Sequence, residues 1–146
     1  MLNFWQKWNK KRKLKKLLLE FYGEVKKNLE AYYVMDQLER LRSFHLESWQ
    51  KVKDYANIAF GEEISFYIKI IEEYNRTLES FKSYEQWYAS DVNNKTQENA
   101  RILHLKKQEA DQKFKNFDQV IKPAIAVLET RLRAMNVPEK ELMRKL

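Results

Sequence analysis

The fold of this chain is decided by residues 14–60, LKKLLLEFYGEVKKNLEAYYVMDQLERLRSFHLESWQKVKDYANIAF, which carry a helical pattern from end to end. In the first part, apolar side chains recur every three or four residues and share one face of an α-helix. They are Leu14, Leu17, Leu18, Phe21, Val25, Leu29 and Tyr32. A second apolar set follows and comprises Leu38, Leu41, His45, Trp49, Val52, Tyr55, Ala56 and Phe60.

The two apolar sets do not share one face. At about 100° per residue, the second set lies roughly 100° or more around the helix axis from the first. One straight helix would have to present two different faces, so we predict a break between Met35 and Ser48. Ser43 and Ser48 are available there as N-caps of a new helix. Whether residues 14–60 form one helix or two decides between three and four long helices.

Composition favours an all-α protein. The 146 residues are 44% apolar and 14% aromatic, which is enough to build a hydrophobic core in one domain. Only 2 Gly and 2 Pro are present, so turns and strand ends have few markers. Long helices joined by short connections favour an antiparallel up-down bundle. We assign the bundle to residues 17–137, between an N-terminal head at 1–16 and a C-terminal tail at 138–146.

The second half of the chain predicts two more long helices. One begins after Gly61, a residue that can adopt positive φ and end the preceding helix, and it continues to Ala89. The polar segment 90–97 is the clearest loop. Asn94 or Thr96 is expected to cap the helix that follows.

That last helix contains a proline. Its apolar stripe keeps the same phase from Ala100 to Met135, on both sides of Pro123. The missing N–H and the ring of Pro123 predict a kink inside one continuous helix. Asn136 and Pro138 are expected to end the helix, and a frayed turn or two can follow in the tail.

The positive charge of the protein is concentrated in the head. The chain has 28 Lys and Arg residues against 21 Asp and Glu residues, for a net charge of +7. Seven cations lie in residues 1–16, so the 21 others balance the acidic residues. The head also carries Leu2 and three aromatic side chains. Tryptophan rings favour the headgroup region of a bilayer, and polybasic clusters are drawn to anionic lipids.

We therefore predict that the head binds a membrane surface or a partner. The predicted binding residues are Phe4, Trp5, Lys7, Trp8, Lys10, Lys11, Arg12, Lys13, Lys15 and Lys16. The alternatives are a solvated, frayed helix start, nucleic acid, and an acidic protein partner. No apolar run is long enough to span a bilayer, and the N-terminus lacks the pattern of a signal peptide. The expected location is the cytoplasm, either free or attached to the inner face of the membrane.

Residues for chemistry are scarce. The chain has no Cys, and each of its two histidines, His45 and His104, is preceded three residues earlier by Arg rather than by Glu. The Glu-x-x-His pairs of di-iron bundles are therefore missing. Two glycines cannot build a phosphate-binding loop. We predict a protein that is not an enzyme and that holds no metal or cofactor.

One motif points to an enzyme. Arg40 and His45 are separated by four residues, which resembles the Arg-x-x-x-x-His motif of HEPN-type ribonucleases, a family of small helical bundles. The resemblance implies that the pair would activate a ribose hydroxyl and stabilise phosphate at a dimer interface. The alternative is a solvated helical face with His45 at the edge of the core.

Asn28 lies within the first apolar stripe. We expect it at the margin of the stripe, bonded to water, and the alternative is a buried amide that fixes register.

A wider resemblance involves residues 12–80. The segment Leu17–Leu29 with Glu24 and Asn28, then Ser48-Trp49 and Tyr74-Asn75, resembles a group of uncharacterised bacterial helical proteins that have an N-terminal anchor. The resemblance implies proximity to a membrane and no particular activity. Together with the head, it predicts a scaffold or interaction module.

Overall fold

The computed structural model describes residues 3–38, 40–54 and 60–144, and these residues form helices and no strand. The helices are α1 (Phe4–Leu38), α2 (Glu47–Val52), α3 (Glu62–Ser90), the 3-10 turn η1 (Val92–Asn94), α4 (Gln97–Phe114), α5 (Asp118–Ala134) and α6 (Glu139–Leu142). The prediction of an all-α protein is confirmed. Tyr55 and Ala56 of the second apolar set, and Leu2 of the head, lie outside the described residues.

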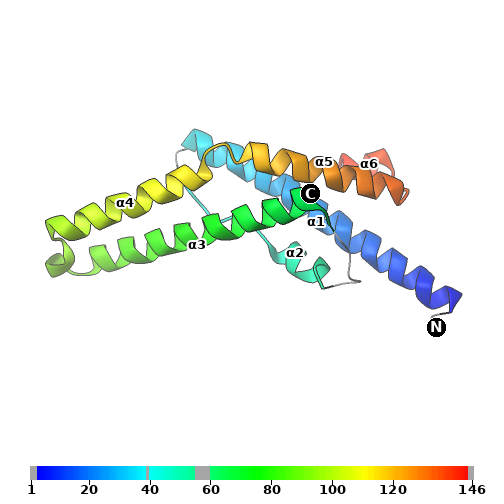
Figure 1. Ribbon diagram of the computed structural model, residues 1–146, viewed down its shortest axis with the longest axis horizontal. Helices are drawn as coiled ribbons and strands as arrows, with labels where there is room; N and C mark the ends of the chain where they lie inside the picture. Colours follow the sequence, from blue (N-terminus) through cyan, green and yellow to red (C-terminus); the bar gives the residue numbers. More distant parts are fainter. Residues whose placement is uncertain (1–2, 39, 55–59, 145–146) are drawn as a thin grey trace.

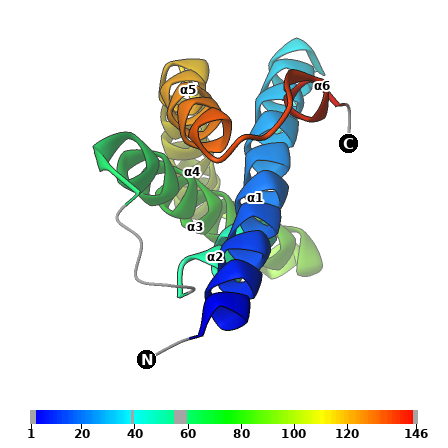
Figure 2. The ribbon, with the colours of Figure 1, turned by 90° about the vertical axis from the view of Figure 1, so that its right-hand side faces the viewer.

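The helices are arranged as one long helix packed across a helical hairpin (Figure 1). α3 and α4 run antiparallel and are joined by η1. α5 follows α4 and runs in roughly the same direction as α4. α1 packs on α5 and carries the short α2 on another side (Figure 2). The N-terminal end of α1 and the tip of the α3–α4 hairpin project at opposite ends of the long axis (Figure 1).

The core lies where α1, α3 and α5 meet. Its side chains are the apolar stripes of these helices, including Leu18, Phe21, Val25, Ile64, Tyr67, Ile71, Tyr74, Leu78, Ile121, Leu128 and Leu132. Two aromatic clusters occupy this core. Phe21 lies 5.3 Å from Trp49 and 6.4 Å from Phe60, measured between ring centroids. The second cluster consists of Tyr32, Phe44, Tyr74, Phe114 and Phe117.

The predicted break in residues 14–60 is present. α1 ends at Leu38, and α2 begins only at Glu47, after a linker whose residues 40–46 are not helical. The second apolar set does not form one stripe, because Leu38 is 68% exposed and Val52 is the buried residue of α2.

The predicted caps of α2 are wrong. Leu46 holds the N-cap position without a side-chain hydrogen bond. The carboxylate of Glu24 on α1 takes this role, since it accepts hydrogen bonds from the backbone N–H groups of Ser48 at 2.9 Å and Trp49 at 3.3 Å. A carboxylate from a neighbouring helix thus satisfies the N–H groups that a local serine would otherwise bind.

The continuous last helix is also a wrong prediction. α4 ends at Phe114 and α5 begins at Asp118, whereas Pro123 lies inside α5. Asn116 occupies the left-handed region with φ 58°, which asparagine adopts more readily than most residues. The break has a packing consequence: α4 lies on α3, and α5 can turn to pack on both α1 and α3.

The loops were predicted with more success. Thr96 caps α4, because its hydroxyl oxygen accepts from the backbone N–H of Asn99 at 3.0 Å. Gly61 has the expected positive φ of 89°, although it is the N-cap of α3 and not the end of the preceding helix.

The tail does not fray as expected. Pro138 begins α6, and Leu142 in this helix is only 2% exposed. The carbonyl oxygen of Leu142 accepts hydrogen bonds from the Tyr22 hydroxyl at 3.3 Å and from Lys26 Nζ at 2.8 Å. The C-terminal turn is therefore fixed to the middle of α1.

Candidate functional site

The basic head is the first part of α1. Asn3 and Gln6 form a reciprocal capping pair: the Gln6 N–H donates to Asn3 Oδ1 at 2.8 Å, and the Asn3 N–H donates to Gln6 Oε1 at 3.0 Å. This is the capping-box arrangement with Asn in place of Ser or Thr. The Asn-x-x-Gln spacing in the sequence is a local signal for this helix start, although it was not among the predicted caps. It starts the helix before the cations, so the head is ordered as an extension of the core helix.

The aromatic side chains of the head are exposed. Phe4 is 86% exposed, Trp5 66% and Trp8 49%. Phe4, Trp8, Lys11 and Lys15 follow one another at intervals of three or four residues, so they share one face of α1. The guanidinium carbon of Arg12 lies 5.4 Å from the ring centroid of Trp8. The end of α1 that projects in Figure 1 therefore carries exposed aromatic rings close to cations.

The first lysines of α1 are not paired with carboxylates in the described part of the chain. The first acidic residue in the chain is Glu20. Among the described residues, Lys7, Lys10 and Lys11 have no carboxylate within the 4.0 Å of an ion pair, and the salt bridges of the α3–α6 region lie elsewhere. Their positive potential is therefore available to an anionic partner.

Two grooves flank this part of α1. The groove between α1 and the end of α5, which we call the α1–α5 groove, has a volume of about 690 Å³. Its lining is Trp8, Lys11, Arg12, Leu14, Lys15, Leu18, Arg131, Ala134, Met135 and Asn136. The groove on the α2 side measures about 730 Å³ and is lined by Asn9, Arg12, Lys13, Lys16, Leu17, Glu20 and Lys51.

The predicted head residues are thus divided among three places. The α1–α5 groove gathers Trp8, Lys11, Arg12 and Lys15. The other groove gathers Lys13 and Lys16 together with Arg12. Phe4, Trp5, Lys7 and Lys10 line neither groove. Arg131 and Met135 were not predicted, because they come from a helix more than a hundred positions away and no local pattern marks them.

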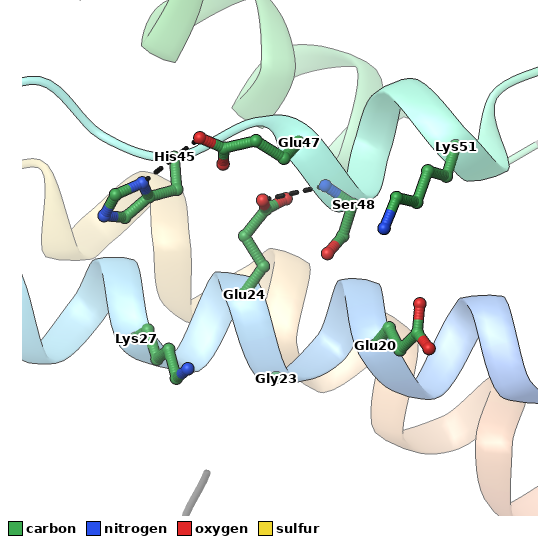
Figure 3. A pocket seen from close by; sticks show the side chains of 8 residues that line it. All are labelled: Glu20, Gly23, Glu24, Lys27, His45, Glu47, Ser48 and Lys51. Atoms are coloured by element: carbon green, nitrogen blue, oxygen red, sulfur yellow. Dashed lines mark hydrogen bonds and ion pairs between the residues drawn. The ribbon is translucent and has the colours of Figure 1, made fainter.

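A further pocket of about 460 Å³ lies between α1 and α2 (Figure 3). It is lined by Glu20, Gly23, Glu24, Lys27, His45, Glu47, Ser48 and Lys51. The carboxylate of Glu24 points to the backbone of α2, and the His45 ring is turned towards Glu47 (Figure 3). His45 Nδ1 and Glu47 Oε1 are 3.5 Å apart, and both side chains are mostly exposed.

Two carboxyl groups in this pocket, those of Glu24 and Glu47, are engaged by backbone N–H groups. Burial raises the pKa of Glu24, while the N–H groups of Ser48 and Trp49 oppose this rise. The pKa of Glu47 is lowered, first by its own backbone N–H and then by His45. No group of three metal-binding side chains occurs within residues 3–38, 40–54 and 60–144. The Glu24 carboxylate is already committed to holding the start of α2.

Glu24 makes the stability of the protein depend on pH in a specific direction. Because the pKa of Glu24 is raised in the folded state, the folded protein binds the Glu24 proton more tightly than the unfolded chain does. The stabilisation by this proton is present at low pH and is lost as the pH rises through the folded-state pKa. We expect the wild type to gain stability relative to Glu24→Gln as the pH falls from neutral towards 4.5, the ordinary pKa of this carboxyl. Urea unfolding of both proteins across this range measures the difference. A constant difference would contradict the prediction.

The linker between α1 and α2 is held by two asparagines. Asn75 on α3 accepts from the Phe44 N–H at 2.9 Å and donates to the Phe44 carbonyl at 3.0 Å. Asn28 on α1 pairs in the same way with the N–H of His45 at 3.0 Å and its carbonyl at 2.9 Å. Consecutive residues of an extended chain turn their backbone groups to opposite sides. The linker therefore runs between the side-chain amides of Asn75 and Asn28. Each amide makes the pair of backbone hydrogen bonds that a neighbouring strand makes in a sheet.

Asn28 is not at the margin of the stripe, as expected from the sequence. It is fully buried, and its amide also donates to the Tyr67 hydroxyl at 2.8 Å. The alternative of a buried amide is confirmed. Because every strong donor and acceptor of this amide has a partner, its burial is tolerated.

The residues of the Arg-x-x-x-x-His motif lie in this linker and not on a helix. Arg40 is exposed, and the backbone of His45 is bound by Asn28 while its side chain faces Glu47. The alternative of a solvated helical face does not describe these residues, because neither lies in a helix.

The residues of the wider resemblance gather around the same linker. Glu24 binds the Ser48 and Trp49 backbone, and the Tyr74 hydroxyl donates to the Arg42 carbonyl at 2.9 Å. Their shared task in this chain is to hold the linker and α2. These contacts concern the linker and α2, and they do not involve the basic head.

Comparisons with protein-family models, curated proteins and solved structures found no significant match to this chain. The resemblances therefore stay predictions. None of the helices in the described part of the chain is long and apolar enough to cross a membrane. The feature of the described chain that bears most on function is the projecting, basic end of α1.

Proposed function

We propose that this protein is a non-enzymatic scaffold or interaction module that binds anionic membrane surfaces reversibly through the first turns of α1. The observation that supports this proposal best is the exposure of Phe4, Trp5 and Trp8 on a helix end that also carries the whole excess positive charge. Exposed aromatic rings of this kind are expensive in water and favourable in a headgroup layer.

The expected strength suits a reversible attachment. Each cation near an anionic bilayer surface contributes up to about 1 kcal/mol. Long lysine side chains can keep their charge at the phosphates while the rings enter the interface. Salt screens such contacts over about 8 Å at physiological ionic strength. Binding should therefore weaken steadily as salt is added.

Vesicle co-sedimentation tests the proposal. The full chain should bind vesicles that contain phosphatidylglycerol and should not bind pure phosphatidylcholine vesicles. The variant Lys7→Gln/Lys10→Gln should bind about tenfold more weakly, because it removes two charges that line neither groove.

The control variant is Lys82→Gln/Lys107→Gln, which removes the same charge from exposed positions on α3 and α4. It should bind like the wild type. Equal weakening in both variants would show that only net charge matters, and absence of binding to anionic vesicles would refute the proposal. Binding to RNA at low salt without vesicle binding would favour the nucleic-acid alternative.

A further inference from the structure

We propose that the α1–α5 groove holds a single anionic phospholipid molecule, with its phosphate among the cations and the start of an acyl chain on the apolar floor. This inference rests on the proposed attachment to membranes and names the ligand class of one surface within it. The groove is lined by cations, it has apolar side chains next to the core, and it lies beside the exposed aromatic residues of the head.

Cations from both helices line the groove. Lys11 and Lys15 come from α1, and Arg131 comes from α5, where its guanidinium carbon also lies 5.5 Å from the ring centroid of Phe60. None of the described residues that line the groove is acidic. The groove on the α2 side differs in this respect, because Glu20 is part of its lining. Charge complementarity therefore favours a phosphate in the α1–α5 groove.

The floor of the groove is apolar and continuous with the core. Leu18 is 1% exposed, and Leu14 and Met135 are half-buried against the core. The volume of about 690 Å³ lies within the range of about 300–1,000 Å³ that is usual for small-molecule sites. A free phosphate would leave this floor wet, whereas a lipid covers it with hydrocarbon. The groove thus favours a molecule that joins an anionic group to an apolar chain.

A nucleotide is a poorer match for the same lining. It would need an open aromatic face for stacking, and Arg12 already lies over one face of the Trp8 ring, at 5.4 Å from its centroid. The groove also adjoins the turn of α1 that carries Phe4 and Trp5, the residues assigned to the membrane interface. A lipid can therefore enter the groove from the bilayer without crossing bulk water.

A short-chain lipid that stays monomeric separates this inference from vesicle attachment. We would titrate the full chain with dihexanoylphosphatidylglycerol below its micelle concentration and follow the heat of binding. One molecule should bind per chain. Glycerol 1-phosphate, which lacks the chains, and dihexanoylphosphatidylcholine, which lacks the net charge, should each bind at least about tenfold more weakly.

Ala134→Trp should abolish this binding, because Ala134 is an exposed residue in the lining and a large ring there fills the groove. Ala126→Trp is the matched control, since Ala126 is exposed on the same helix and does not line the groove. Lys15→Gln, which should weaken binding about fivefold, serves if the tryptophan variant is unfolded by circular dichroism.

The outcomes separate the two proposals. Lys7→Gln/Lys10→Gln should keep monomer binding while losing affinity for vesicles. Vesicle binding without monomer binding, or equal monomer binding by Ala134→Trp and the wild type, would overturn the groove site and leave the attachment proposal standing. Equal binding of glycerol 1-phosphate would assign the groove to phosphate alone and overturn the lipid site.

Discussion

Replacing Asn28 with Leu is expected to lower the free energy of unfolding by about 3 kcal/mol, although the two side chains are similar in size. The buried amide binds the N–H and carbonyl of His45 and the hydroxyl of Tyr67. Leu would leave all three groups without a partner inside the protein, and each such loss costs about 1–3 kcal/mol. Small domains are stable by only about 5–15 kcal/mol, so this change should be plain in urea unfolding.

Asn93→Ala is a suitable control, because Asn93 is an exposed residue in the turn between α3 and α4. It should change stability by less than about 0.5 kcal/mol. A double-mutant cycle with Asn75→Ala should show coupling, since both asparagines hold adjacent residues of one linker. A cost for Asn28→Leu no larger than that of the control would mean that the linker is not held by this amide.

Phe117→Ala should cost about 3–5 kcal/mol in the free energy of unfolding. Phe117 is 1% exposed, and its ring centroid lies 4.7 Å from that of Phe44 and 5.7 Å from that of Tyr74. It sits at the break between α4 and α5, and its ring joins this break to the linker. Truncation leaves a cavity at the point where the linker and α3 meet α5, so the loss is larger than that of transfer alone.

The matched control is Phe66→Ala on α3, where the ring is 53% exposed. This variant should lose less than about 1 kcal/mol. Thermal unfolding followed by circular dichroism gives both values under the same conditions. Similar losses for the two variants would contradict the assignment of Phe117 to the core.

Much of the fold could be predicted because it rests on local patterns. The spacing of apolar side chains gave the stripes of α1, α3 and α5, and the phase change after Tyr32 gave the end of α1 within the expected window. Thr96 is a local cap and was among the predicted ones. Each of these features depends on residues within a few turns of one another.

The failures share a different cause. The cap of α2 comes from Glu24, and the partner of Asn28 is the backbone of His45, so both depend on contacts between distant segments. No Gly or Pro marks the break at Asn116. The break allows α5 to pack on α1, and this contact joins segments that are distant in the sequence. Pro123 lies inside a helix, as the unbroken stripe predicts, and the break lies N-terminal to it at Asn116. The head was predicted as a set of residues, but its division between two grooves needed α2 and α5.

The hydrogen bonds between the linker and the two asparagines limit where the chain can be lengthened or shortened. Surface loops usually accept insertions at little thermodynamic cost. Adding or removing one residue within residues 40–46 would exchange the sides to which the backbone groups of Phe44 and His45 turn. The side-chain amides of Asn75 and Asn28 would then lose the backbone groups that they bind now. Reporter tags or a circular permutation should therefore be placed at the exposed hairpin turn around Asn93, where no such alternation has to be kept.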